Sequence, residues 1–363
     1  MRTLRVAVIV AVAATASMLA RGEQKTRNVI FVMTDGARWQ DAFRGADKAL
    51  MNKQSGVEDV GALKREFWRD SAPARREALM PFLWTVIAKQ GQVYGNRDRG
   101  SDAYVTNGMN FSYPGYSEIL CGFPDNRIDS NDKNENPNAS VLEWLQSRPG
   151  YKGRIAAFGA WDLFPYILNV SRSGLMVSAG YDPLRMSPMT PQLELLNRIK
   201  IETGIWDGEA LDAPAFYTAL EYLKAKRPRV LYMSLGDTDE WAHSGRYDLY
   251  LKSLHRVDEY VRQLWETVQQ MPEYRGSTSL ILGVDHGRGT APKGWRSHGK
   301  KVPDSKYVWM AFLGPDTPAL GERSNIKAVT QSQVAATVAA LLGEDYADAV
   351  PKAGKPIADV VRQ

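Results

Sequence analysis

Five short apolar runs recur along the chain and predict the strands of a central sheet. They cover residues 28–33, 154–158, 229–235, 279–284 and 307–313. Runs of about four to eight apolar residues without polar alternation are typical of strands buried on both faces, as in parallel sheets. We therefore expect a mostly parallel sheet.

Helical spacing of apolar residues fills the segments between these runs. The longest segment, 249–268, places Leu251, Leu254, Val257, Val261 and Leu264 on one face. Further helices are expected at residues 79–88, 139–147, 191–203, 213–226 and 333–342. The alternation predicts an α/β fold, with a mostly parallel central sheet covered by helices on both faces.

Two segments interrupt this alternation and are expected to be surface insertions. Residues 45–76 are charged and weakly periodic, and residues 124–138 are polar and rich in turn formers. Neither an internal repeat nor a low-complexity linker is evident. Residues 21–363 are therefore expected to form one domain with a cap-like insertion.

The first twenty residues have the pattern of a secretory signal peptide. Arg2 and Arg5 precede an apolar run over residues 6–14, and Ala14-Thr15-Ala16 is one candidate cleavage site. This run is shorter than the roughly 20 apolar residues of a membrane-spanning helix, and an uncleaved anchor is the alternative interpretation. We expect an exported protein, periplasmic or secreted, with no membrane span beyond this signal.

Composition and charge bear on whether the partner is a nucleic acid or a small anionic substrate. Hydrophobic residues make up 44% and charged residues 24% of the 363 residues, which is typical of a globular protein. The net charge of +5 is spread along the chain without a nucleic-acid-binding motif, so it favours a small anionic substrate. Cys121 is the only cysteine and is expected to be a small core residue, so an intramolecular disulfide is excluded. The oligomeric state stays open.

Histidines and aspartates cluster where predicted strands end. Of the four histidines, His243 follows Asp239 by one helical turn, His286 follows Asp285 directly, and His298 lies in a glycine-rich loop. The fourth, His255, lies inside the long helix and is expected to be packed or exposed. Asp35 follows the first strand and adds a third carboxylate.

Such ligands suit zinc or a similar divalent ion, because neutral imidazole and carboxylate are its usual donors. Six ligands exceed the needs of one tetrahedral site, so the sequence predicts a centre of two divalent metal ions, with Zn²⁺ preferred. Two neighbouring metals suit phosphoryl or sulfuryl transfer, because they hold both the attacking and the leaving oxygen.

A nucleophile is expected near the start of a short helix. In the segment 110–122, Pro114 and Gly115 precede a stretch with several apolar residues, which puts Ser112 at or near a helix N-terminus. Backbone N–H groups and the helix dipole favour anions there. A helix-capping serine is the alternative interpretation, and Ser117 is a competing nucleophile deeper in the helix.

In their order, these motifs resemble the alkaline phosphatase superfamily, and most closely its nucleotide pyrophosphatase/phosphodiesterase branch. The resemblance spans residues 28–314 and rests on Thr34-Asp35-Gly36, Ser112-Tyr113-Pro114, the pair Asp239 and His243, Asp285-His286, and His298. It implies one zinc held by Asp239, His243 and His298. A second zinc would be held by Asp35, Asp285 and His286, with Ser112 bridging toward the substrate. Ser112 would then attack phosphorus and form a covalent intermediate.

Departures from the family patterns leave the substrate open. Tyr116 stands where formylglycine sulfatases have arginine, and Gly115-Tyr116 replaces the Asn-His of the diesterase branch. Asn131, Asn134 and Asn136 are alternatives for a substrate-contacting amide, with Asn134 our choice. Arg38, Arg288 and Lys300 are candidate anion clamps, for which solvated surface charge is the other interpretation. Asp237 is a candidate for orienting a metal ligand.

The leading hypothesis is two-metal hydrolysis of phosphate monoesters or diesters through phosphoserine at Ser112. A sulfatase or a phosphotransferase of the same superfamily is the first alternative. A catalytically silent protein that binds metal or anions is the second, and a basic nucleic-acid-binding protein is the third.

Overall fold

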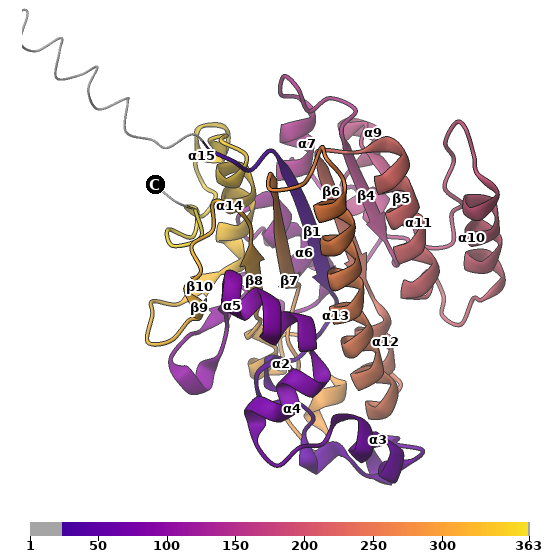
Figure 1. The fold of residues 1–363 in the computed structure, drawn as a ribbon, viewed down its shortest axis with the longest axis vertical. Helices are drawn as coiled ribbons and strands as arrows, with labels where there is room; N and C mark the ends of the chain where they lie inside the picture. Colours follow the sequence, from indigo (N-terminus) through magenta and orange to yellow (C-terminus); the bar gives the residue numbers. More distant parts are fainter. Residues whose placement is uncertain (1–23, 362–363) are drawn as a thin grey trace, which may run out of the picture.

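A central sheet of eight strands, in the order β5-β4-β6-β1-β7-β8-β2-β9, forms the middle of the molecule (Figure 1). The computed structural model describes residues 24–361, so the expected signal peptide lies outside it. The strands are β1 Asn28–Thr34, β2 Gln92–Tyr94, β4 Ile155–Gly159, β5 Met176–Ala179, β6 Val230–Leu235, β7 Thr278–Val284, β8 Met310–Leu313 and β9 Gly321–Glu322. A separate parallel pair joins β3 (Ala103–Tyr104) to β10 (Val329–Thr330).

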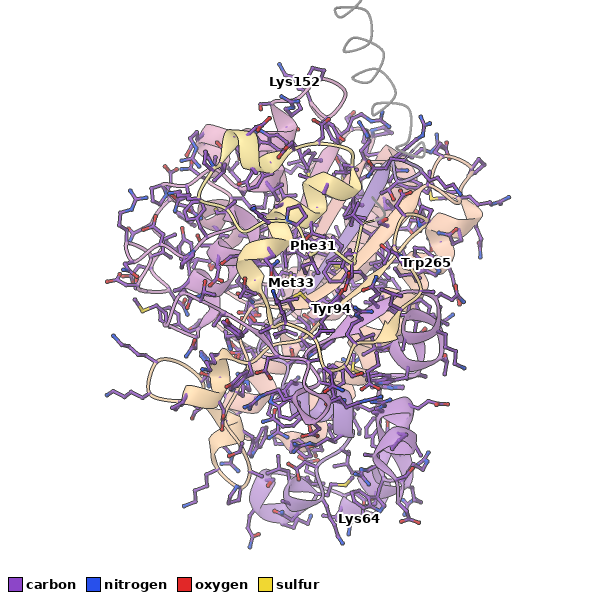
Figure 2. The ribbon with its side chains drawn as sticks, turned by 90° about the vertical axis from the view of Figure 1, so that its left-hand side faces the viewer. Phe31, Met33, Lys64, Tyr94, Lys152 and Trp265 are labelled. Atoms are coloured by element: carbon purple, nitrogen blue, oxygen red, sulfur yellow. The ribbon has the colours of Figure 1, made fainter. Side chains whose placement is uncertain are left out.

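The expected mostly parallel sheet is confirmed. β1 lies between β6 and β7 and is parallel to both, and β4 and β5 continue in the same direction. Every residue of β1, β6 and β7 is buried, which explains their unbroken apolar sequences. Phe31 and Met33 lie at the centre of the molecule, whereas Lys64 and Lys152 lie at opposite ends (Figure 2).

Helices cover both faces of the sheet, as the pattern predicted (Figure 1). α11 and α13 pack on one face, and α6, α7 and α14 pack together on the other. The expected apolar face of α13 is buried from Leu251 to Leu264. The helices are α2 Trp39–Arg44, α3 Val60–Phe67, α4 Ala72–Leu79, α5 Ala88–Gln90, α6 Ser112–Cys121, α7 Val141–Gln146, α8 Phe164–Ile167, α9 Val170–Ser173, α10 Pro191–Glu202, α11 Asp212–Lys226, α12 Asp237–His243, α13 Tyr247–Gln270, α14 Val334–Leu341 and α15 Tyr346–Ala349.

The two expected insertions have different structures. Residues 124–138 form no helix or strand, whereas residues 45–76 contain α3 and part of α4 beyond the carboxyl end of β1 (Figure 1). An Nη2 atom of Arg296 donates to the carbonyl of Gln54 (2.6 Å), so this first insertion contacts the loop that leads to His298. None of the helices within residues 24–361 is long and apolar enough to cross a membrane.

Two expected elements differ from the prediction. The last apolar run becomes strand β8 only from Met310, and it is antiparallel to β7. Residues 307–308 bond to Tyr104 and Ala103 instead, which removes them from the central sheet. The helix expected at 79–88 is found at residues 81–90, with a π-helical turn, η3 (Leu83–Ile87), before α5, and only Met80 separates it from α4, which ends at Leu79.

Candidate metal centre and nucleophile

The carboxyl ends of three neighbouring strands bring the predicted ligands together. Asp35 follows β1, Asp239 and His243 lie on α12 directly after β6, and Asp285 and His286 follow β7. Because β6, β1 and β7 are adjacent and parallel, their ends meet at one edge of the sheet, where α/β proteins bind ligands. Elements remote in sequence thus converge on one point.

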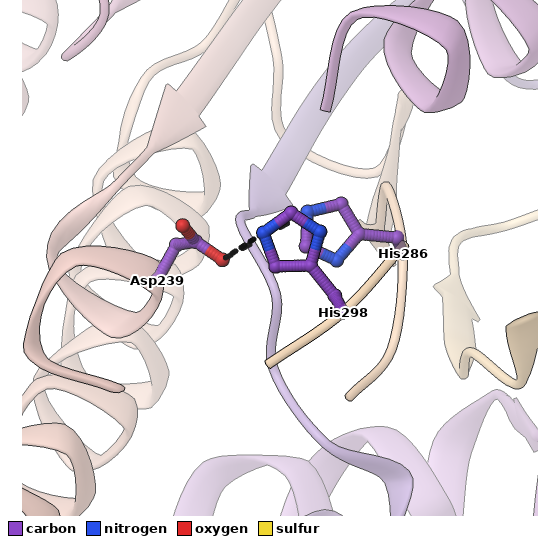
Figure 3. A group of neighbouring side chains, drawn as sticks. All are labelled: Asp239, His286 and His298. Atoms are coloured by element: carbon purple, nitrogen blue, oxygen red, sulfur yellow. Dashed lines mark ion pairs between the residues drawn. The ribbon is translucent and has the colours of Figure 1, made fainter. Parts of the chain in front are cut away.

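Two overlapping groups of side chains have their ligand atoms within 4.8 Å of one another. One contains Asp35, Asp285 and His286, as the resemblance implied, and the other contains Asp239, His286 and His298. Nε2 of His286 lies 3.2 Å from Asp35, 3.4 Å from Asp285 and 3.8 Å from Asp239. The imidazoles of His286 and His298 stack with centroids 3.9 Å apart (Figure 3).

His243 completes the second group from the solvent side. Its Nε2 lies 3.0 Å from a carboxylate oxygen of Asp239 and 2.9 Å from Nε2 of His298. The side chain is 45% exposed, in contrast to the buried His286. Asp239, His243 and His298 are therefore adjacent, as the resemblance implied.

The atoms left without hydrogen bonds fit divalent cations. Oδ1 of Asp35 and Oδ2 of Asp285 are buried and accept no hydrogen bond from any described residue. Burial, with the neighbouring carboxylates, raises the pKa of both acids, so negative charge there needs a positive partner. Burial also lowers the pKa of His286 to about 4, which keeps its imidazole neutral and able to bind metal. Carboxylates with neutral imidazoles match the donor set of zinc.

Backbone contacts orient these ligands. His286 Nδ1 lies 2.9 Å from the carbonyl of Gly287, which favours the tautomer that leaves a lone pair on Nε2. The backbone N–H of Gly36 donates to Oδ1 of Asp285 (3.0 Å). Gly36 has φ +58°, and a Cβ there would stand 2.4 Å from Oδ1 of Asp239, so only glycine fits this turn.

Ser112 lies beside this cluster, at the first residue of α6. Its Oγ is 3.3 Å from Nε2 of His286, and the residue is 6% exposed. Phe111, which precedes the helix, is extended, and Asn110 has φ +55°. The competing Ser117 instead lies against Asn136 and Cys121 inside the core.

The two residues that depart from the family patterns have structural reasons. A Cβ on Gly115 would stand 2.4 Å from the carbonyl oxygen of Asp285, so glycine lets α6 approach the predicted metal ligands. The hydroxyl of Tyr116 donates to Oδ2 of Asp35 (2.9 Å) and accepts from Oγ of Ser234 (2.7 Å). Tyr116 therefore fixes a ligand, a role that its sequence position did not predict.

Arg38 and Arg288 are buried, which corrects their interpretation as solvated surface charge. Arg38 pairs with Asp41 (2.7 Å) and Asp47 (3.4 Å), contacts that stabilise the start of α2. Nη2 of Arg288 donates to a carboxylate oxygen of Asp239. Both guanidinium groups are thus already paired with carboxylates, which leaves Lys300, an exposed residue of the His298 loop, as the solvated cation of the three.

The candidate amides lie at different places. Asn131 is next to Ser112, because its Oδ1 accepts from the N–H of Tyr113 (3.0 Å). Asn134 is exposed and contacts Tyr113 through its carbonyl, and Asn136 is buried against Ser117. Among these contacts, only that of Asn131 is made with the backbone of the first turn of α6.

Two further acidic side chains, Asp237 and Glu209, are buried near the site. Asp237 accepts from the N–H of Asp212, so it joins α12 to α11 rather than contacting a metal ligand. Glu209 is buried, and one of its carboxylate oxygens fills the space where Gly236 lacks a Cβ. Sequence reasoning missed Glu209, because its segment carries no motif and reaches the site only through folding.

Comparison with known proteins identifies the family. The profile of the type I phosphodiesterase / nucleotide pyrophosphatase family matches residues 29–353, nearly the whole chain. The chain belongs to this family. A curated relative, a 2,3-bisphosphoglycerate-independent phosphoglycerate mutase from Haloarcula marismortui, is 27% identical over 142 residues. That match spans 39% of this chain and 26% of the relative.

Comparison with solved structures shows that this member of the type I phosphodiesterase family has the alkaline phosphatase fold. The alkaline phosphatase PafA superposes with a TM-score of 0.59 at 10% identity, covering 94% of this chain and 100% of PafA. The lipoteichoic acid synthase LtaP from Listeria monocytogenes gives 0.56 at 12% identity, covering 90% and 74%. A putative sulfatase from Bacteroides thetaiotaomicron gives 0.56 at 13% identity, covering 92% and 74%. The expected superfamily and fold class are confirmed.

Proposed function

We propose that this protein hydrolyses phosphate esters through a covalent phosphoserine at Ser112. The observation that carries the proposal is the position of Ser112 Oγ, at a helix N-terminus and 3.3 Å from the Nε2 of His286 that borders both ligand groups. A protein that only binds metal or anions needs no hydroxyl at this point. Membership of the type I phosphodiesterase family supports phosphorus as the centre attacked.

In this proposal, six side chains hold the metal ions and Ser112 attacks phosphorus. One divalent ion would be held by Asp35, Asp285 and His286, and a second by Asp239, His243 and His298. When bound, such ions, for which zinc suits the donors, lower the pKa of a nearby hydroxyl and offset the charge that develops on phosphate oxygens. The dipole at the start of α6 adds favourable positive potential.

The reaction has two balanced steps. Ser112 Oγ forms a bond to phosphorus while the bond to the leaving oxygen breaks, and the hydroxyl proton goes to the leaving group. Water then attacks the phosphoserine, the Ser112 oxygen leaves phosphorus, and a proton returns to it. Asn131, whose Oδ1 accepts from the N–H of Tyr113 in the first turn of α6, would contact a substrate oxygen with its amide N–H. A small anionic ester is the proposed substrate, and the signal-like pattern of residues 1–20 supports a reaction outside the cytoplasm.

Turnover of aryl esters tests the proposal. Zinc-loaded protein would be assayed on aryl phosphate monoester, diester and sulfate substrates, beside Ser112→Ala and the control Ser117→Ala, a serine of the same helix. We expect turnover of a phosphate ester that falls by about a thousandfold or more in Ser112→Ala and persists in Ser117→Ala. Turnover of sulfate alone would support the sulfatase alternative, and loss of turnover in Ser117→Ala alone would reassign the nucleophile.

A further inference from the structure

The two candidate metal positions differ in the charge that already surrounds them. The first position, Asp35 with Asp285 and His286, contains two buried carboxylates. Their hydrogen-bond donors are neutral, the hydroxyl of Tyr116 for Asp35 and the N–H of Gly36 for Asp285. Within residues 24–361, no lysine or arginine forms an ion pair with either carboxylate. The two carboxylates of the first position thus have no ion-pair partner among the lysines and arginines of the described residues.

The second position, Asp239 with His243 and His298, has only one carboxylate, and a buried arginine is already bound to it. Nη2 of Arg288 donates to Oδ1 of Asp239 and to its main-chain carbonyl (3.0 Å), and Nε donates to the carbonyl of Gly36 (3.1 Å). The guanidinium is fully buried, so solvent screens its charge little. Three hydrogen bonds to two elements hold it in place.

Other nearby charges do not remove this difference. Glu209 and Glu240 act electrostatically on both Asp35 and Asp239, so they favour cations at both positions. Arg288 is the one buried cation in direct contact with a predicted ligand among the described residues. Arg288 also acts electrostatically on Asp35, but of the predicted ligands it contacts only Asp239. A dication at the second position therefore meets a carboxylate that is already ion-paired, whereas a dication at the first meets two carboxylates that no lysine or arginine contacts.

We propose that the two positions bind divalent metal with unequal affinity and that Arg288 sets the difference. The Asp35–Asp285–His286 position fills first and tightly, and the Asp239–His243–His298 position fills second and weakly. Occupancy of the second position, and with it the fully loaded site, then follows the free concentration of the metal. This inference rests on the two-metal part of the proposed function.

A zinc titration of the chelator-stripped full chain, followed by calorimetry and by competition with a chromophoric chelator, tests this inference. Wild-type protein should bind two zinc ions in two steps. In Arg288→Met the second step should tighten by about tenfold or more, because about 1.4 kcal/mol corresponds to a factor of ten. The first step should change much less, because Arg288 acts on Asp35 without contacting it. Arg38→Met is the matched control, since Arg38 is equally buried but paired with Asp41, and its titration should keep both steps.

A second variant assigns the steps even if Arg288→Met fails to fold. His243 is 45% exposed, so His243→Ala should preserve the fold. It should lose the weak step and retain the tight one. Equal affinities in the wild type, loss of the tight step in His243→Ala, or an unchanged second step in folded Arg288→Met would each overturn the inference. Two unequal steps without ester turnover would instead contradict the proposed function and leave this inference standing.

Discussion

At the residue scale, the site depends on partners that hold each ligand oxygen in place. Asp35 illustrates this, because one of its oxygens accepts from Tyr116 while the other accepts no hydrogen bond and is available to a cation. Such supporting hydrogen bonds orient a metal ligand and tune its basicity. The proposed metal-binding role of Asp35 therefore depends on Tyr116, a side chain that is not itself a predicted ligand.

Replacing Tyr116 by phenylalanine should weaken zinc binding at the Asp35 position by about 10- to 100-fold, because the ligand loses its orienting donor. The ring stays packed against Phe164, so the fold should persist. Competition with a chelator measures the affinity. Tyr113→Phe is the control, since its hydroxyl donates to Asn134 instead, and an equal loss in both variants would contradict the assigned role.

Asp258 on α13 offers a pH-dependent test of a buried carboxyl outside the site. Its oxygens accept from the N–H groups of Phe82 (2.7 Å) and Leu83 (2.8 Å), and burial raises its pKa to about 7. The folded state then holds this proton more tightly than the unfolded state does. Its contribution to stability is complete at pH values below about 4 and is lost as the pH rises toward 7.

Asp258→Asn removes that titration while keeping an acceptor oxygen. Relative to wild type, the variant should gain up to about 4 kcal/mol in free energy of unfolding between pH 4 and 7, since one pKa unit is worth about 1.4 kcal/mol. Urea unfolding of both proteins in identical buffers measures this gain. Parallel pH profiles would show that the Asp258 carboxyl is ionised in the folded protein throughout.

At the element scale, the ends of β6, β1 and β7 lie next to one another, and this brings motifs that are far apart in the sequence into one candidate site. The close approach of α6 then adds Ser112, the proposed nucleophile, and this approach depends on Gly115. The apolar runs predicted these strands and the parallel sheet well, because full burial on both faces leaves a strong signal. They predicted β2, β3, β5, β9 and β10 not at all, because these strands have only two to four residues.

Gly115→Ala tests the packing of α6. The new methyl group would stand 2.4 Å from the carbonyl oxygen of Asp285, so α6 must move away from the metal ligands. We expect a loss of about 1–3 kcal/mol in unfolding free energy and a fall in turnover. Gly61→Ala in α3 is the control, where the methyl meets only side-chain atoms at 3.3 Å and should stabilise the helix. Unchanged stability and turnover in Gly115→Ala would refute this account.

At the scale of the whole molecule, the order of the motifs predicted the cluster of candidate ligands. It did not predict the side-chain contacts between segments that are far apart in the sequence. Arg288 and Arg38 carry no sequence signal that separates a buried ion pair from a surface charge. Glu209 and Tyr116 reach the site through packing between segments far apart in the chain. The sequence therefore predicted which side chains come together at the candidate site, and the fold was needed to show which residues support them.

Metal binding should stabilise the whole fold, because the buried carboxylates of Asp35 and Asp285 lack a cationic partner without it. Zinc at about 100 times its dissociation constant should add about 2.7 kcal/mol of unfolding free energy per site. Thermal unfolding with zinc or with a chelator measures this. Asp285→Asn should lose most of the shift at low zinc concentration, and an equal shift in that variant would contradict the assignment of the tight position.

The central claim, phosphoryl transfer to Ser112, is tested most directly by trapping the intermediate. Zinc-loaded protein would be mixed with an aryl phosphate, quenched in acid during turnover, digested and analysed by mass spectrometry. We predict one phosphoryl group on the peptide that contains Ser112, and none in Ser112→Ala. Rapid ester turnover that leaves Ser112 unmodified at every quench time, and that persists in Ser112→Ala, would contradict the account.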